Sequence, residues 1–388
     1  MTTGSGSVKG DVWLLVGTRK GGFILSSDKS RRTWALAGPD GAGSEVFHFV
    51  YDPRNGGRVV AAVNQMICGP EIQFSGNLGG AWTSGQRQPR FSGDSGQIVD
   101  RLWHIEPGEE SEPGVMYVGV QPAALFRSDD SGDTWSEVKG LSTHPTRDQW
   151  QPGHGGLCLH SMVIDPRDTN RFWVGMSAVG VFGTSDGGEN WQPMNQGVRV
   201  DFLPDSFPEF GHCPHKLLSP KSQLDVLYQQ NHCGVFPSDS AGGSWTDITG
   251  DLPSRFGFVL GLHSQDPDTI YVLPEEEALG DLVGGAKRYV TDAKMRVFRS
   301  WNAGRDWEPL TKGLPQEHAY INVLREGMAT NDRDPCGIYF GTATGQLFYS
   351  RDDGDTWELM LDNLPPILLW KRGWPCDPRY WFRYSGTF

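Results

Sequence analysis

One short pattern recurs seven times along the chain and restricts its fold more than any other feature. The pattern is Ser/Thr-x-Asp/Asn-x-Gly-x-x-Trp, and complete copies are SDDSGDTW (Ser128 to Trp135) and SRDDGDTW (Ser350 to Trp357). The remaining copies, some with a substitution and the first with one extra residue, end at Trp34, Trp82, Trp191, Trp245 and Trp307. Self-similarity repeated in this way is typical of a repeat architecture.

The residue types of the pattern indicate a hydrogen-bonded hairpin turn. The Asp or Asn side chain accepts hydrogen bonds from backbone amides inside the turn. The Gly supplies the backbone freedom that the turn needs, and the Trp packs beneath it between neighbouring sheets. Seven such turns therefore predict seven similar structural units.

The segments around each turn predict four short strands per repeat. In the fourth repeat, LCLHSMVIDP, RFWVGMS and GVFGTS precede the turn, and its Trp opens the last strand. Repeats of this kind predict an all-β, seven-bladed β-propeller. The first repeat lacks its innermost strand, and we expect PPILLW (Pro365 to Trp370) to supply it and close the ring. This assigns residues 1–370 to one propeller and leaves 371–388 as a C-terminal tail of unknown structure.

Over about residues 12–370 the chain resembles the Asp-box (BNR) repeat proteins, a sialidase-like superfamily of propellers. GTRKGG near the start, HGGLCLH in the middle and GHCPH later are similar to proteins that carry a sialidase-like or glycosyl hydrolase label. The resemblance implies that the Asp-box turns lie on the face away from the active site. It specifies a fold rather than an activity, because such turns occur in hydrolases and in assembly factors alike.

The net charge and the cysteine content indicate which binding partners and which cellular compartment the chain suits. The net charge of −13 argues against non-specific binding to nucleic acid or anionic membranes. The six cysteines are scattered without a CxxC pair, which favours reduced thiols. No stretch has the length of a membrane span or of a signal-peptide core. We therefore expect a cytoplasmic protein.

Histidines recur in the predicted inner strands of successive blades. His104, His160 and His215 each stand 13 residues before an aromatic residue of the next strand, and His48 is one residue off this spacing. His263 belongs to the sixth inner strand with a shorter spacing. Inner strands run along the central channel of a propeller, so side chains at one level either meet at the axis or pack between blades.

Convergence at the axis would create a metal site. We expect His48, His104, His160 and His215 to bind one divalent transition metal (Zn, Fe, Cu, Mn or Ni) through neutral imidazole. In the alternative interpretation each histidine packs between blades and bonds to the backbone. Cys158 lies near these residues, and so does Cys213; both are more simply buried thiols.

Further residues complete the predicted site around the axis. Glu45, His263 and Arg101 are the candidate catalytic residues, with Glu45 as a base if a bulge turns it towards His48. The candidate substrate-binding residues are Trp150, His212 and Arg325. Long connections that lead into the inner strands are expected to form a pocket wall on one face, with residues 148–156 as its best candidate.

Three functions compete on this evidence. The first is a metal-dependent hydrolase, lyase or oxygenase that acts on a small-molecule or glycan-like substrate. The second is a sialidase-like glycoside hydrolase, although the sequence shows only Arg19 in place of an arginine triad and Tyr320 beside Glu317 as a nucleophile pair. The third is a non-catalytic scaffold or assembly factor, in which side chains fill the central channel and no metal is bound there.

Overall fold

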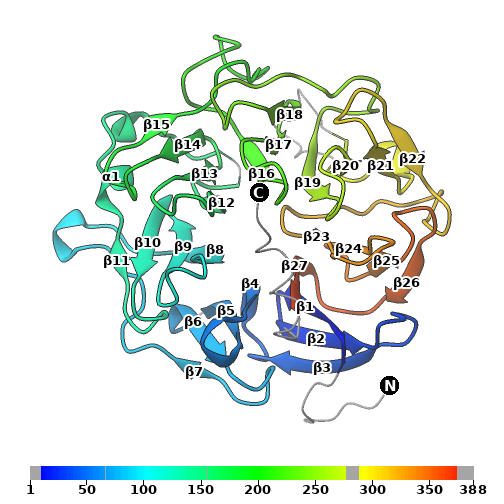
Figure 1. Ribbon diagram of the computed structural model, residues 1–388, viewed down its shortest axis with the longest axis horizontal. Coiled ribbons are helices and arrows are strands. Elements are labelled where there is room, and N and C mark those ends of the chain that lie inside the picture. The colour runs from blue at the N-terminus through cyan, green and yellow to red at the C-terminus, as the bar shows by residue number, and fades with distance from the viewer. Residues whose placement is uncertain (1–9, 66, 154, 277–287, 374–388) are drawn as a thin grey trace, which may run out of the picture.

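The computed structural model describes residues 10–65, 67–153, 155–276 and 288–373. In this part of the chain seven antiparallel sheets stand around a central axis as the blades of a propeller (Figure 1). The predicted fold class, an all-β seven-bladed propeller, is confirmed. No helix among these residues is long and apolar enough to cross a lipid bilayer.

The first four blades each contain four strands, listed here from the axis outwards. Blade one consists of β27 (Ile367–Gly373), β1 (Val12–Thr18), β2 (Gly21–Ser27) and β3 (Ala35–Asp40). Blade two consists of β4 (Glu45–Asp52), β5 (Arg58–Gln65), β6 (Gly69–Ser75) and β7 (Thr83–Ser84), and blade three of β8 (Arg101–Pro107), β9 (Met116–Gln121), β10 (Ala124–Ser128) and β11 (Ser136–Glu137). Blade four consists of β12 (Leu159–Ile164), β13 (Phe172–Met176), β14 (Gly180–Thr184) and β15 (Gln192–Pro193).

The last three blades continue the ring, and blade five departs from the expected four strands. Blade five is β16 (Pro214–Leu218), β17 (Leu227–Asn231) and β18 (Gly234–Ser238); blade six is β19 (Gly257–Leu262), β20 (Ile270–Pro274), β21 (Val297–Ser300) and β22 (Glu308–Leu310); blade seven is β23 (Met328–Thr330), β24 (Ile338–Gly341), β25 (Leu347–Ser350) and β26 (Glu358–Leu361). In blade five the outer segment still donates two backbone hydrogen bonds to β18, from Thr246 and Ile248. The one α-helix of the described residues is the single turn α1 (Lys139–Ser142).

The C-terminal strand β27 closes the ring as expected. It pairs antiparallel with β1, from Thr18 opposite Ile367 to Trp13 opposite Gly373. The strand therefore runs three residues beyond the predicted propeller boundary at 370, and the remainder of the predicted tail lies outside the described residues. Ile367 is fully buried among residues of blades one and seven, so the closure joins the two ends of the chain through both hydrogen bonds and apolar contact.

Six of the seven repeated turns share one hydrogen-bond arrangement. In blade three, the amide of Gly132 donates to Ser128 Oγ at 2.7 Å and the amide of Thr134 donates to Asp130 Oδ1 at 2.8 Å. The same bonds recur in the turns that begin at Ser75, Thr184, Ser238, Ser300 and Ser350. The φ of +90° at Gly132 is the left-handed conformation that favours glycine.

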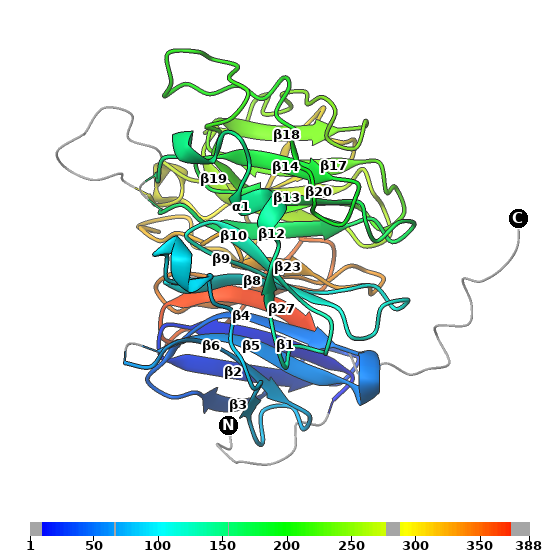
Figure 2. The ribbon, with the colours of Figure 1, turned by 90° about the vertical axis from the view of Figure 1, so that its left-hand side faces the viewer.

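The alternating strand directions divide the connections between two faces. Each inner strand pairs antiparallel with the second strand of its blade, and the red arrow in Figure 2 marks the direction of the inner strand β27. We call the side on which the chain enters each inner strand the entry face; the turns between second and third strands share it. The repeated Ser/Thr-x-Asp/Asn turns join third to fourth strands and lie on the opposite side, the turn face. Long connections gather on the entry face, where loops on a rigid scaffold commonly carry function.

Candidate functional site

The inner-strand histidines occupy two different registers. In blade three, Tyr117 of the second strand pairs with Glu106, which lies two residues after His104. In blades four and five, the matching aromatic residues Trp173 and Tyr228 pair with residues that lie three positions after His160 and His215. The hairpin that follows the inner strand is one residue longer in blade three, so equal sequence spacing does not mean equal register. The expectation that these three histidines share one register is therefore wrong.

A β-bulge sets the direction of each of these side chains. The pairing of β4, β8, β12 and β16 with the second strand shifts at matching places, and the extra residues are Phe47, Trp103, His160 and His215. His48 and His104 directly follow the bulge of their strands. Because a shift of one residue moves a side chain to the other side of a strand, the two pairs of histidines point to different surroundings.

His48 and His104 meet in the interior with charged groups from other blades. Their ring centroids are 4.6 Å apart, and His48 Nε2 lies 3.9 Å from Glu326 Oε2. Lys216 Nζ lies 2.5 Å from the other carboxylate oxygen of Glu326, and His104 Nε2 lies 2.9 Å from Glu106 Oε2. We call His48, His104, Lys216 and Glu326 the axial cluster. All four are buried.

His160 and His215 instead bond to the backbone of the next blade. His160 Nε2–H donates to the carbonyl of Pro214 at 2.9 Å, and its Nδ1 lies 2.9 Å from the hydroxyl of Ser161. His215 Nδ1–H donates to the carbonyl of Gly257 at 2.6 Å. Burial lowers the pKa of both imidazoles, that of His160 well below its usual range. They are neutral links between blades.

The four predicted metal ligands therefore do not form one site. Both ring nitrogens of His160 are engaged, so no lone pair remains for a metal. Among the described residues, His48 and His104 form one potential ligand group with Glu326, and His215 belongs to another. His263 lies on the turn face, where its Nε2 is 3.1 Å from Asp353 Oδ1, and it cannot contribute to a site on the entry face.

Two predicted substrate-binding residues are part of the structural core. Trp150 is 5% exposed, and its indole Nε1–H donates to Thr146 Oγ1 at 2.9 Å. His212 is fully buried and bonds through Nε2–H to the carbonyl of Pro208 at 2.7 Å. Each of these hydrogen bonds fixes the connection in which the residue lies. Residues 148–156 include position 154, which lies outside the described residues.

Arg325 is the predicted residue that does lie centrally on the entry face. Its Cζ is 5.7 Å from the ring centroid of Trp103 and 5.3 Å from that of Phe258, and Nη2–H donates to Ser177 Oγ at 3.3 Å. These partners come from blades three, six and four. We call Arg325, Trp103, Phe258 and Ser177 the mouth. The Nε–H of Arg325 is buried and has no hydrogen-bond partner within the described residues.

Glu45 and Arg101 form an ion pair near the mouth. Arg101 Nε lies 3.3 Å from Glu45 Oε1, and the guanidinium stands 5.8 Å from the ring centroid of Phe47. The bulge at Phe47 that the catalytic prediction for Glu45 required is present. Glu45 stands at the start of β4, on the entry face, whereas His48 lies further along the strand, in the axial cluster.

A second carboxyl group of the entry face escaped the sequence analysis. Glu275 follows β20 and is fully buried; its Oε1 accepts a hydrogen bond from the amide of Val323 at 2.9 Å. Burial raises its pKa to about 8, so it is mostly protonated at neutral pH. Its Oε2 has no partner within the described residues. In the sequence Glu275 is the first of three consecutive glutamates in PEEE, and this run does not indicate that its side chain is buried.

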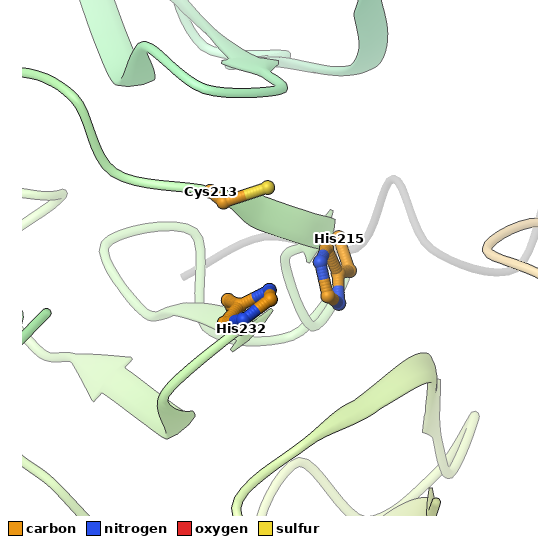
Figure 3. A group of neighbouring side chains, drawn as sticks. All are labelled: Cys213, His215 and His232. Atoms are coloured by element: carbon orange, nitrogen blue, oxygen red, sulfur yellow. The ribbon is translucent and has the colours of Figure 1, made fainter. Parts of the chain in front are cut away.

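A third group lies beside the mouth in blade five. Cys213, His215 and His232 turn towards one another in Figure 3, and one ligand atom from each lies within 4.8 Å of the others. His232 stands in the turn between β17 and β18 and is not among the site residues predicted from the sequence. Ser177 Oγ of the mouth lies 3.6 Å from Cys213 Sγ.

Comparison with known proteins gives two sequence relatives, and no family model matches the chain. The chain is 23% identical over 226 residues to the oligoxyloglucan-reducing end-specific xyloglucanase of Emericella nidulans. It is 21% identical over 230 residues to a probable enzyme of the same description from Neosartorya fischeri. These alignments cover 51% and 52% of the chain but only 26% of each relative.

Solved structures share the fold. The GH74 xyloglucanase from Xanthomonas campestris superposes with a TM-score of 0.60 at 17% identity, over 95% of the chain and 55% of that structure. The GH74 enzyme of Niastella koreensis gives 0.59 at 17% identity, over 92% of the chain and 54% of that structure. The likeness thus concerns the propeller, and the chain spans about half of each of these proteins.

These findings correct the expectation of a metal-dependent enzyme with a poly-histidine site on the axis. Both sequence relatives are described as xyloglucanases, which are glycoside hydrolases, and so is the superposed structure from Xanthomonas campestris. In the interior, a lysine–glutamate ion pair stands beside His48 and His104, and His160 and His215 bond to backbone carbonyls. The glycoside hydrolase alternative of the sequence analysis is therefore favoured over the metal-dependent one.

Proposed function

We propose that this protein is a glycoside hydrolase of the Asp-box (BNR) superfamily, with its active site at the mouth on the entry face. Glu275 is the observation that carries the proposal. Glycoside hydrolysis needs one carboxylic acid that keeps its proton near neutral pH and a second carboxylate. Burial gives Glu275 the first property, with a pKa of about 8. The shared turn hydrogen bonds support the superfamily assignment.

The remaining roles follow from position. Glu45 is the candidate second carboxylate, held by Arg101 on the same face. The half-buried guanidinium of Arg325 lies beside the aromatic rings of the mouth, and this combination of a polar group with aromatic walls is suited to a sugar. A glycan is the substrate class, as the xyloglucanase relatives suggest. The cytoplasmic location stays a prediction.

The experiment is release of reducing ends from a panel of xyloglucan oligosaccharides, other β-glucans and an aryl sialoside. We expect turnover of at least one neutral glycan and none of the sialoside, because the chain lacks an arginine triad. Glu275→Gln and Glu45→Gln should each lower kcat by about 10²–10⁴-fold, the usual contribution of an acid–base residue.

The matched control is Glu317→Gln, an exposed carboxylate beside Tyr320. The Glu317→Gln variant should keep the kcat of the unaltered protein, because Glu317 has a role only in the sialidase-like interpretation. Absence of turnover on every glycan would reject the proposed function. Sialic acid release that is lost in Glu317→Gln would replace it by the sialidase-like mechanism, and full activity of Glu275→Gln would remove Glu275 from the assignment.

A further inference from the structure

Blade five brings a cysteine and two histidines together at the edge of the mouth. Cys213 precedes β16, His215 lies on its bulge, and His232 comes from the turn that follows β17 (Figure 3). One ligand atom from each lies within 4.8 Å of the others. Cys213 and His232 are half-buried and His215 is buried, so the group adjoins solvent on one side only.

The hydrogen bond of His215 prepares its ring for a metal. Nδ1–H donates to the carbonyl of Gly257 at 2.6 Å, so Nε2 carries the lone pair. Metal-binding histidines usually donate their other N–H to a carbonyl or carboxylate in this way, which fixes both tautomer and orientation.

Cys213 supplies the sulfur atom of the group. The thiolate is the ligand form of cysteine, and a metal displaces the proton of the thiol when it binds.

Aromatic rings hold the two imidazoles in place. Phe256 lies 5.2 Å from the ring centroid of His215 and 5.0 Å from that of His232, and Phe202 lies 5.1 Å from His232. These contacts restrict the orientation of both imidazoles.

We propose that Cys213, His215 and His232 bind one zinc-type divalent ion and leave a fourth position open at the mouth. Ligand atoms of a tetrahedral zinc site lie about 3.3–3.6 Å apart, given bonds of about 2.0–2.3 Å. The ligand atoms of Cys213, His215 and His232 lie within 4.8 Å of one another, so binding would draw them together by about 1 Å. One thiolate and two imidazoles select zinc, cobalt or copper over calcium and magnesium. This site lies outside the axial cluster, and it does not depend on the proposed hydrolase activity.

Titration of the metal-free full-length protein with Co²⁺, in the absence of any glycan, tests the proposal. We expect one equivalent to bind with a thiolate-to-cobalt charge-transfer band and the ligand-field absorption of a four-coordinate ion, and Zn²⁺ to displace it. Cys213→Ser should abolish the charge-transfer band, and His232→Ala should weaken binding by at least about 10-fold. His215 is not used as the first variant because it also links two blades.

Cys68→Ser is the matched control, because Cys68 is an exposed thiol outside the group. It should bind Co²⁺ as the unaltered protein does. Thermal unfolding of each variant without metal shows whether it is folded. A charge-transfer band that persists in Cys213→Ser, or one that disappears in Cys68→Ser, would overturn the proposal, as would the absence of one-equivalent binding. Glycan hydrolysis is measured separately, so failure of the metal site and failure of the proposed function remain distinguishable.

Discussion

Lys216 of blade five and Glu326 of blade seven form an ion pair in the interior of the propeller, with 2.5 Å between Nζ and Oε1, although 110 residues separate them in the chain. Both are buried, and His48 and His104 lie beside them. Residues of four blades thus meet through charged and polar side chains. A buried charge is tolerated because it has its partner, so loss of one partner should cost more than loss of both.

Lys216→Met should lower the free energy of unfolding by about 3–5 kcal/mol, because it leaves the Glu326 carboxylate buried without its cation. The double variant Lys216→Met/Glu326→Leu should recover most of this loss. Urea unfolding followed by Trp fluorescence provides the measurement. Arg199→Met, which breaks the exposed pair with Asp201, serves as control and should cost less than about 1 kcal/mol. Equal losses in the single and double variants would contradict the interpretation.

Ring closure should depend on β27 and not on the residues that follow it. Truncation before Ile367 removes the inner strand of blade one and exposes the edge of β1, so the whole protein should unfold at lower temperature or aggregate. Truncation after Gly373 keeps every hydrogen bond between β27 and β1 and should leave the Tm unchanged. Differential scanning calorimetry compares the two. A stable protein without β27 would show that the ring does not need closure.

His160→Ala should destabilise the fold without affecting metal binding. The substitution removes two hydrogen bonds and leaves the carbonyl of Pro214 buried without its donor, at a cost of about 2–4 kcal/mol. Urea unfolding measures the loss, and the Co²⁺ titration measures binding under native conditions. A folded variant of unchanged stability that no longer binds Co²⁺ would instead place His160 in a metal site.

Glu275 should make stability fall as the pH rises. Its pKa is raised from 4.5 to about 8 in the folded state, so the folded protein holds a proton that the unfolded chain releases between these values. This contribution is fully present below about pH 4.5 and is lost as the pH rises through about 8. Its size is roughly 3–5 kcal/mol.

Glu275→Gln keeps the shape of the carboxylic acid without the titration. Urea unfolding at a series of pH values should therefore give a free energy of unfolding that changes less with pH in this variant than in the unaltered protein. The variant should gain the most stability, relative to the unaltered protein, at alkaline pH. Parallel profiles for the two proteins would show that Glu275 is ionised in the fold, and they would also weaken its assignment as general acid.

The sequence by itself determined the architecture, because the features that specify it are local. Each repeated turn contains its own donors and acceptors, such as Asp130 and the amide of Thr134 four residues later. Counting the turns gives the number of blades. The missing first inner strand and the surplus apolar run at 365–370 then require ring closure, which β27 provides.

The site was decided by the tertiary structure, because it depends on register and on contacts between distant segments. The bulges in β8, β12 and β16, together with one extra hairpin residue in blade three, separate His104 from His160 and His215, although all three share one sequence spacing. The cation that pairs with Glu326 comes from two blades away. Nothing local to His232 indicates that a turn 17 residues beyond His215 returns it to Cys213. Side-chain direction in a strand reverses with every single-residue shift, so only the assembled ring fixes which residues meet.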